Sequence, residues 1–138
     1  FPYTVVTMEV EITVLDACHA DYASRLRAVL THAARHRGVT HAHMEAYIVG
    51  NDFMEKNVLV YPSVHDFPRP DLAERRDLGE LYINPHYITE HGEDFVCMAI
   101  HGFLHLLGYD HRGKHDTVKM DAAEKELRAA VIPQLSHE

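Results

Sequence analysis

Three histidines lie within a short and otherwise largely apolar stretch, HGFLHLLGYDH, at residues 101–111. His101 and His105 are four residues apart, a spacing that puts two side chains on one face of a helix, about one turn apart. Gly108 can adopt the left-handed conformation that ends a helix and turns the chain back, which would bring His111 to the same point. Three imidazoles around one ion leave a fourth position for water, the pattern of catalytic zinc.

The alternative interpretation is a group of core histidines that hydrogen-bond to carbonyl groups. A single buried histidine is usually explained in that way. Three are harder to explain, because each neutral imidazole needs partners for two nitrogens and an apolar helix offers few. One metal ion satisfies a nitrogen of every ring at once. The sequence therefore predicts one Zn²⁺ per chain, bound by His101, His105 and His111.

The spacing His-x3-His-x2-Gly-x2-His is also that of the metzincin proteases. Their catalytic base is a glutamate directly after the first histidine, and this chain has Gly102 at that position. Without the glutamate, the usual route to activating water for peptide hydrolysis is absent. The pattern favours a metal site and argues against a protease.

The elements that position the motif follow from periodicity. An apolar segment from about Glu93 to Leu107 predicts a buried helix, with Glu93 and Asp94 at its positive end and Gly108 after its last turn. Strict alternation over residues 8–14 predicts a strand, because side chains in a strand point alternately to its two sides. We expect an α+β domain with a single small sheet of about four strands packed by helices. The other predicted elements are a helix over 22–33 that stops at Gly38, strands at 44–49, 57–61 and 78–83, a loop over 62–77, and an amphipathic helix over about 116–130 that stops before Pro133.

The segment HGFLHLLGYDH resembles the signature of the YbeY family of metal-dependent endoribonucleases, which act in ribosomal RNA maturation. NVLVYP (57–62) and LGELYIN (78–84) are similar to two strands of that family, and the resemblance extends over about residues 57–127, with Met120 in the last helix. It implies His101, His105 and His111 as zinc ligands in a cleft beside a mixed sheet. It also implies RNA as the substrate, and the small ribosomal subunit with its assembly factors as partners.

The sequence departs from the family at two positions. The family usually has an arginine shortly before the NVLVYP-like strand, whereas GNDFMEKNVLVYP contains none. It also commonly has a serine where this chain has Val60. Lys56 is the nearest candidate to replace the arginine, and Arg112 and Lys114 follow the last predicted ligand. Each of the three is alternatively a solvated surface cation.

Three further residues could act at such a site. Asp110 precedes the last predicted ligand and is either a general base, a group that orients a ligand histidine, or a turn residue bonded to backbone. Glu80 lies in a predicted strand and either faces the cleft to position water or faces outward. Cys97 is four residues before His101, and we interpret it as a small buried hydrophobe rather than a fourth ligand.

The composition limits the partners. The chain has 138 residues, 46% hydrophobic and 25% charged, which is typical of one folded domain, here 1–138. Its formal charge of −8 argues against a broad nucleic-acid surface, so RNA would need a local basic patch. Residues 25–37 contain several cations, which form either such a patch or an ordinary polar helix face.

Two distant cysteines favour a reducing, cytoplasmic location, and no apolar run is long enough to span a membrane.

Three functions remain open from the sequence. The first is a zinc-dependent endoribonuclease that prefers single strands. The second is a non-enzymatic ribosome-assembly factor that a metal ion stabilises. The third is an atypical zinc hydrolase or peptidase with an unusual base.

Overall fold

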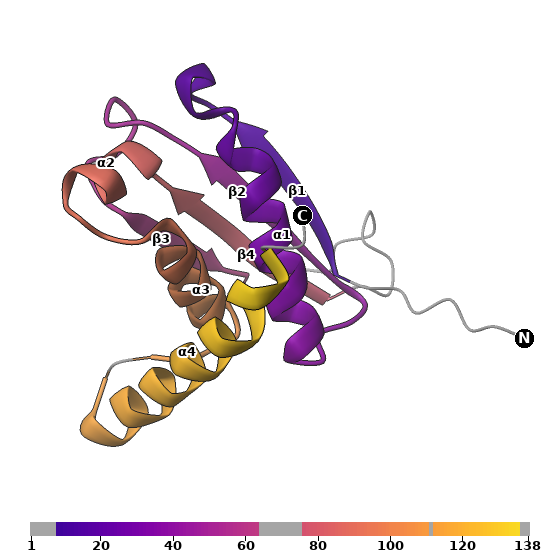
Figure 1. Cartoon of the computed structure of the whole chain (residues 1–138). Coiled ribbons are helices and arrows are strands. Elements are labelled where there is room, and N and C mark those ends of the chain that lie inside the picture. The colour runs from indigo at the N-terminus through magenta and orange to yellow at the C-terminus, as the bar shows by residue number, and fades with distance from the viewer. Residues whose placement is uncertain (1–7, 64–75, 111, 136–138) are drawn as a thin grey trace, which may run out of the picture.

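Four strands and three longer helices make up most of the computed structural model, which describes residues 8–63, 76–110 and 112–135 (Figure 1). The predicted strands and the predicted helices are all present, and one further short helix occurs among them. In chain order the elements are β1 (Glu9–Val14), a 3-10 turn η1 (Ala17–His19), α1 (Tyr22–His36), β2 (Ala42–Ile48), β3 (Val58–Pro62), β4 (Arg76–Ile83), α2 (Pro85–Glu90), α3 (Phe95–Leu106) and α4 (Lys114–Leu135).

The sheet has the order β1-β2-β4-β3, and it is mixed, as predicted. β1, β2 and β4 run parallel, whereas β3 is antiparallel to β4. α1 connects β1 to β2, because two adjacent parallel strands need a crossover rather than a tight turn. β1 and β3 are therefore the two edge strands of the sheet.

The two faces of the sheet differ in chemistry. Alternate residues such as Val10, Ala46 and Leu81 are buried on the face that α1 and α3 cover. The alternation places charged and aromatic side chains on the opposite face, which we call the outer face. Its residues include Glu9, Glu11, His43, Glu45, Tyr47, Tyr61, Glu80 and Tyr82.

The helices bury their apolar stripes against the sheet and one another. In α1 the buried residues recur at helical spacing, from Leu26 through Val29 and Leu30 to Ala33. α4 packs across α1 and α3 through a stripe that includes Met120 and Leu127 (Figure 1). As a result, α3 lies between the sheet on one side and α4 on another.

Two sequence predictions need correction. The short helix α2, which starts at Pro85, was not among the predicted elements. It forms because the Asn84 side chain accepts a hydrogen bond from the Tyr87 backbone N–H at 3.1 Å and proline suits the first helical turn. α4 was predicted to stop before Pro133, but it continues to Leu135. Pro133 removes one helical hydrogen bond, and because it lies in the final turn the helix ends two residues later at Leu135. The predicted loop over 62–77 lies mostly outside the described residues.

None of the helices among the described residues combines the length and the hydrophobicity that spanning a membrane requires.

Candidate metal centre

The two ends of α3 are fixed by local hydrogen bonds. At its start, the Asp94 carboxylate accepts a hydrogen bond from the Val96 backbone N–H at 3.2 Å and caps the helix. At its end, Gly108 has a φ of 105°. The N–H of Gly108 bonds to the His105 carbonyl and that of Tyr109 to the Leu104 carbonyl, both at 3.1 Å, which is a Schellman motif. The predicted role of Gly108 is confirmed.

The histidines of α3 converge on one point. The Nε2 atoms of His101 and His105 lie 3.1 Å apart, and the ring centroids are 4.6 Å apart at an interplanar angle of 76°. The opposite ring nitrogens have their own partners. His101 Nδ1 lies 3.0 Å from Glu124 Oε1, and His105 Nδ1 lies 3.0 Å from the Tyr109 carbonyl oxygen. Each ring is held by an outer acceptor while its Nε2 faces the other histidine.

These contacts determine which nitrogen carries the proton. A carbonyl oxygen only accepts, so Nδ1 of His105 donates to Tyr109, and Nδ1 of His101 donates in the same way to the Glu124 carboxylate. In the neutral rings both Nε2 atoms then present lone pairs to each other, which is unfavourable without a cation between them. Two nitrogens bound at ~2.0–2.1 Å to a tetrahedral zinc ion lie ~3.3–3.4 Å apart, close to the observed separation. The pair therefore fits a metal ion, and outer acceptors of this kind usually orient metal-bound histidines.

Gly102 faces the sheet rather than the histidines. A Cβ atom added there would lie 2.8 Å from Leu81 Cδ1 and 2.9 Å from Val58 Cγ2. Glycine is required at this point because α3 approaches β3 and β4 so closely. A glutamate here would be directed into the packed layer, so the position offers no room for the base of a metzincin protease.

The third predicted ligand, His111, lies outside the described residues. Asp110, the residue before it, is paired with Arg112 through an Oδ2–Nε distance of 2.7 Å. The same turn lines a hollow of about 360 Å³ that reaches across to Asp116 and Lys119 of α4. Asp110 is thus placed on the turn that follows the two histidines, with a cation beside it.

Two other predicted site residues are placed elsewhere. Glu80 lies on the outer face, where its Oε1 accepts a hydrogen bond from the Tyr82 hydroxyl at 2.9 Å. Because α3 covers the opposite face, Glu80 does not face the histidines, and the alternative interpretation as an outward-facing residue fits its position. Lys56 is exposed in the turn before β3, two residues from Val58, whose side chain contacts Gly102.

The surroundings of Cys97 favour the thiol over the thiolate. Its partly buried position raises the pKa from 9.0 to about 11, and a hydrogen bond from Sγ to Asp94 Oδ2 at 3.2 Å adds to the increase. A zinc ligand must be a thiolate, which this environment disfavours. Cys97 is half-buried rather than buried, and its thiol is engaged with Asp94.

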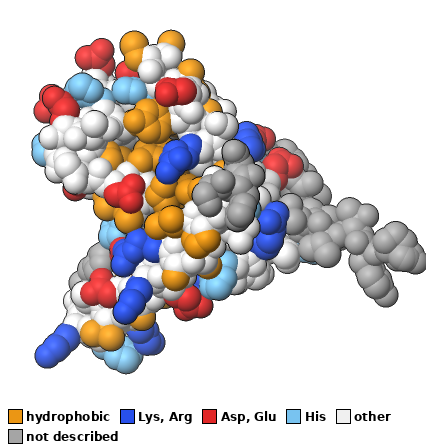
Figure 2. Space-filling view, viewed as in Figure 1, with side chains coloured by type: hydrophobic (Ala, Val, Ile, Leu, Met, Phe, Trp, Pro, Cys, Tyr) orange, Lys and Arg blue, Asp and Glu red, His pale blue; other side chains and the backbone are white. Residues whose placement is uncertain are grey.

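Two cations predicted for a possible patch make internal contacts. Arg27 of α1 donates to the Val10 carbonyl at 2.8 Å, and Arg37, directly after α1, donates to the Tyr109 hydroxyl and pairs with Glu126 at 3.7 Å. Arg25 and Arg35 of α1 are exposed, so the contacts of Arg27 and Arg37 support the polar-face interpretation for only part of the predicted patch. Figure 2 shows further Lys and Arg side chains along α4, with acidic side chains among them. Exposed cations that follow the predicted third ligand in the sequence are Arg112, Lys114, Lys119 and Lys125.

Sequence reasoning missed both outer partners of the histidines. The Tyr109 carbonyl is a backbone group, and no side-chain pattern could reveal it. Glu124 carried a signal, since it is four residues after Met120 and three before Leu127 and so shares the buried stripe of α4. An acidic residue on a buried stripe usually has a specific partner.

Comparisons with known proteins identify related sequences. A family model described as Endoribonuclease YbeY matches residues 9–131. Endoribonuclease YbeY of Wolbachia sp. subsp. Drosophila simulans is 32% identical over 77 residues, which is 50% of this chain and 51% of that protein. The Endoribonuclease YbeY of Rhodopseudomonas palustris is 33% identical over 81 residues, 53% of this chain and 42% of that protein. The chain thus spans about half the length of these curated relatives.

A solved structure shares the fold. The solution structure of a protein from Thermotoga maritima matches 94% of this chain and 95% of its own chain with a TM-score of 0.53. At 19% sequence identity, this likeness concerns the arrangement of the strands and helices alone.

Proposed function

Because this chain belongs to the YbeY family of endoribonucleases, we propose that it is a zinc-dependent endoribonuclease that cleaves single-stranded RNA during ribosomal RNA maturation. Its partners would be ribosomal RNA, the small ribosomal subunit and the assembly factors of that subunit, in the cytoplasm. We further propose that residues 1–138 form a single metal-dependent hydrolase domain. The observation that carries the proposal is the 3.1 Å approach of His101 Nε2 and His105 Nε2, each with its Nδ1 held by an outer acceptor.

His101, His105 and His111 would hold the ion, one per chain. Zn²⁺ in such a site supplies a Lewis acid that lowers the pKa of water and polarises a phosphoryl oxygen. The protein's own contribution is orientation, since Glu124 and the Tyr109 carbonyl keep both described rings in the tautomer that ligation requires. The side chain of His101 is 25% exposed, so a flexible single strand can approach it more easily than a stiff duplex.

Asp110 is our candidate for the general base, because it lies on the turn between the two described histidines and His111. Lys56 is our candidate to replace the missing family arginine, since it is exposed before β3 and carries the nearest cation in the sequence. We do not assign Glu80 to the reaction, because its carboxylate lies on the outer face. Replacing Lys56 with arginine should preserve cleavage, whereas Lys56→Ala should lower it.

The experiment compares wild type, His105→Ala and the control His86→Ala, prepared identically, on single-stranded RNA. His86 is an exposed histidine that pairs with Glu90 at 3.0 Å and lies outside the site. Wild type and His86→Ala should retain zinc by elemental analysis and cleave RNA, and a chelator should stop the cleavage. His105→Ala should lose the cleavage and the zinc ion that His101, His105 and His111 would hold. Equal cleavage by His105→Ala would identify a contaminating nuclease and remove the proposal.

A second candidate is a non-enzymatic assembly factor whose metal ion holds the turn after α3. The pairing of Asp110 with Arg112 favours it, because both the candidate base and a nearby cation are engaged with each other. The same experiment separates the two candidates. Zinc retained by wild type with no cleavage that depends on His105 would support the assembly factor.

A further inference from the structure

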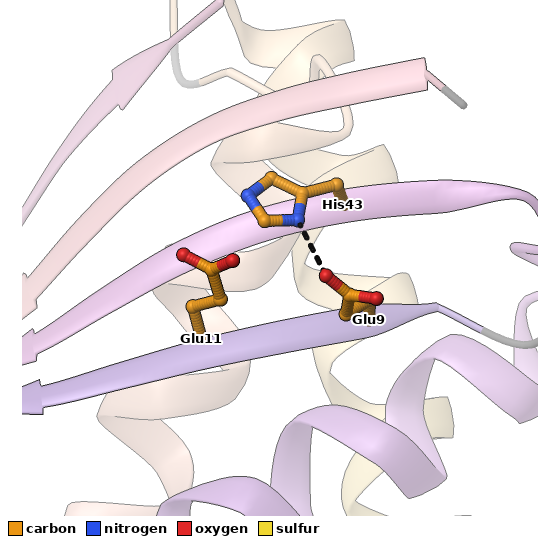
Figure 3. Close-up of side chains that lie close together, drawn as sticks. All are labelled: Glu9, Glu11 and His43. Atoms are coloured by element: carbon orange, nitrogen blue, oxygen red, sulfur yellow. Dashed lines mark ion pairs between the residues drawn. The ribbon is translucent and has the colours of Figure 1, made fainter. Parts of the chain in front are cut away.

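A second group of metal-binding side chains lies on the outer face of the sheet, away from the α3 histidines. Glu9 and Glu11 project from β1 toward the same side, because one residue separates them. The parallel register pairs Glu9 with His43 of β2. One ligand atom from each of Glu9, Glu11 and His43 lies within 4.8 Å of the others (Figure 3).

His43 distinguishes this group from an ordinary acidic surface. Its side chain is 2% exposed, and its Nδ1 atom is buried without a hydrogen-bond partner. Figure 3 shows Nδ1 pointing toward the Glu9 carboxylate, whose Oε1 is 3.4 Å away. That separation is longer than a normal N–H···O hydrogen bond. A buried polar atom without a hydrogen bond is therefore aimed at the Glu9 carboxylate, in a group that also includes Glu11.

The local charge favours a cation. Glu45 is a third carboxylate close to His43, with Oε1 3.9 Å from His43 Nε2. Glu9, Glu11 and Glu45 bring three negative charges around one imidazole, in a chain whose net charge is already −8. A cluster of one sign attracts counter-ions of the other sign and concentrates them locally. A divalent cation would compensate this charge more fully than a protonated His43 can.

We propose that Glu9, Glu11 and His43 form a second binding site, for a divalent transition-metal cation of the zinc type. One imidazole and two carboxylates form a ligand set that zinc accepts, whereas magnesium and calcium prefer oxygen alone. Ligand atoms around zinc lie ~3.3–3.4 Å apart, so the two carboxylates must move inward. Both glutamates are exposed, with Glu9 at 46%, and their side chains can make that movement while His43 stays fixed.

The position of the site suggests what it does. β1 is an edge strand, and within the described residues β2 is its neighbour in the sheet. An ion bound by Glu9, Glu11 and His43 joins β1 to β2 near the first residues of both strands. The site is thus structural, and it does not depend on the proposed nuclease activity.

The test counts bound Zn²⁺ per chain, by dialysis at micromolar free zinc followed by elemental analysis of the full chain. Wild type should bind two ions, and His101→Ala/His105→Ala should bind one. Adding Glu9→Gln/Glu11→Gln to that variant should remove the remaining ion, whereas adding Glu80→Gln, on the same face, should not. The remaining ion should also raise the Tm, and the rise should disappear with the two glutamine substitutions.

The outcomes separate this site from the α3 site. If the α3 histidines bind no metal, wild type holds one ion, Glu9→Gln/Glu11→Gln removes it, and only the proposed function fails. If His101→Ala/His105→Ala binds no zinc, or still binds it after both glutamates are replaced, the outer-face site does not exist. The glutamates are exposed, so their replacement preserves the fold even where a His43 variant would not.

Discussion

His101 and His105 lie on the helix-covered side of the sheet, whereas His43 lies on the outer face, and their surroundings differ. Both histidines of α3 have an acceptor 3.0 Å from Nδ1, supplied by Glu124 of α4 and by the turn after Gly108. Nδ1 of His43 has no hydrogen bond, and Oε1 of Glu9 is 3.4 Å away from it. The first site is oriented before any ion binds, and the second needs its carboxylates to move.

The comparison shows what a covering layer of helices contributes. Neighbouring strands bring side chains to one face, but they hold those side chains only at their backbone ends. A second layer of helices supplies hydrogen-bond acceptors to the ring ends of the side chains, and these acceptors fix the orientation and the tautomer of each ring. We therefore expect the α3 site to depend on several packed residues and the outer-face site on few.

The largest expected effect is a loss of folding stability in Gly102→Glu. The added side chain meets Leu81 and Val58 and carries a charge into the layer between α3 and the sheet. We expect the free energy of unfolding to fall by more than ~3 kcal/mol, because a buried charge without a partner is among the most destabilising changes. Urea unfolding would measure the loss.

The control for that change is Gly113→Glu, where an added Cβ atom meets nothing within 4 Å. It should alter the free energy of unfolding by less than ~0.5 kcal/mol, as is usual for exposed positions. If Gly102→Glu does not fold at all, Gly102→Ala still tests the crowding, and it should be less stable than wild type. Two glutamate variants of equal stability would show that α3 is not pressed against the sheet at this point.

A smaller effect should follow from Glu124→Gln. The amide oxygen can still accept from His101 Nδ1, but the negative charge that raises the basicity of the ring is lost. We expect zinc affinity at the α3 site to fall by about tenfold, the lower end for the loss of an outer partner. Competition with a chelating dye would measure it, with Glu9→Gln/Glu11→Gln as the background so that only the α3 site is observed.

Glu126→Gln is the matched control on the same helix, since Glu126 pairs with His36 of α1 at 3.1 Å instead. It should leave zinc affinity unchanged. Equal losses in both variants would mean that the effect comes from the charge of α4 as a whole rather than from the contact with His101.

The smallest expected effect is a change in folding stability at high pH, caused by the tyrosines of the outer face. A hydrogen bond to Glu45 and partial burial raise the pKa of Tyr47 to about 12, and burial with a hydrogen bond to Glu80 raises that of Tyr82 to about 12. The folded state therefore keeps these protons above pH 10, where the unfolded chain loses them. Stability should be unaffected below about pH 10 and should fall as the pH rises toward 12.

Absorbance of the phenolate band measures the two ionisations. Glu45→Gln should lower the midpoint of Tyr47, and Glu80→Gln should lower that of Tyr82. Unchanged midpoints in both variants would show that the hydroxyls do not donate to these carboxylates, and the outer face would then be less organised than the helix-covered one.

The sequence by itself determined the local geometry of the α3 site. The spacing of His101 and His105, and the turn at Gly108, depend on residues within a few positions of one another, which helical periodicity relates directly. The order of strands and helices along the chain was predicted for the same reason, whereas the mixed sheet was implied by the resemblance to the YbeY family. The small helix α2 was missed although Asn84 and Pro85 are ordinary signals for a helix start.

Only the tertiary structure decided which remote residues meet. Glu124 is 23 positions from His101 and contacts it because α4 packs across α3. The sequence left both sides of its strand open for Glu80, and the packing of α3 decided between them. His43 meets Glu9 because β1 and β2 pair in parallel in one register. Periodicity states that an element has two faces, but the burial of apolar surface by the whole chain decides what each face contacts.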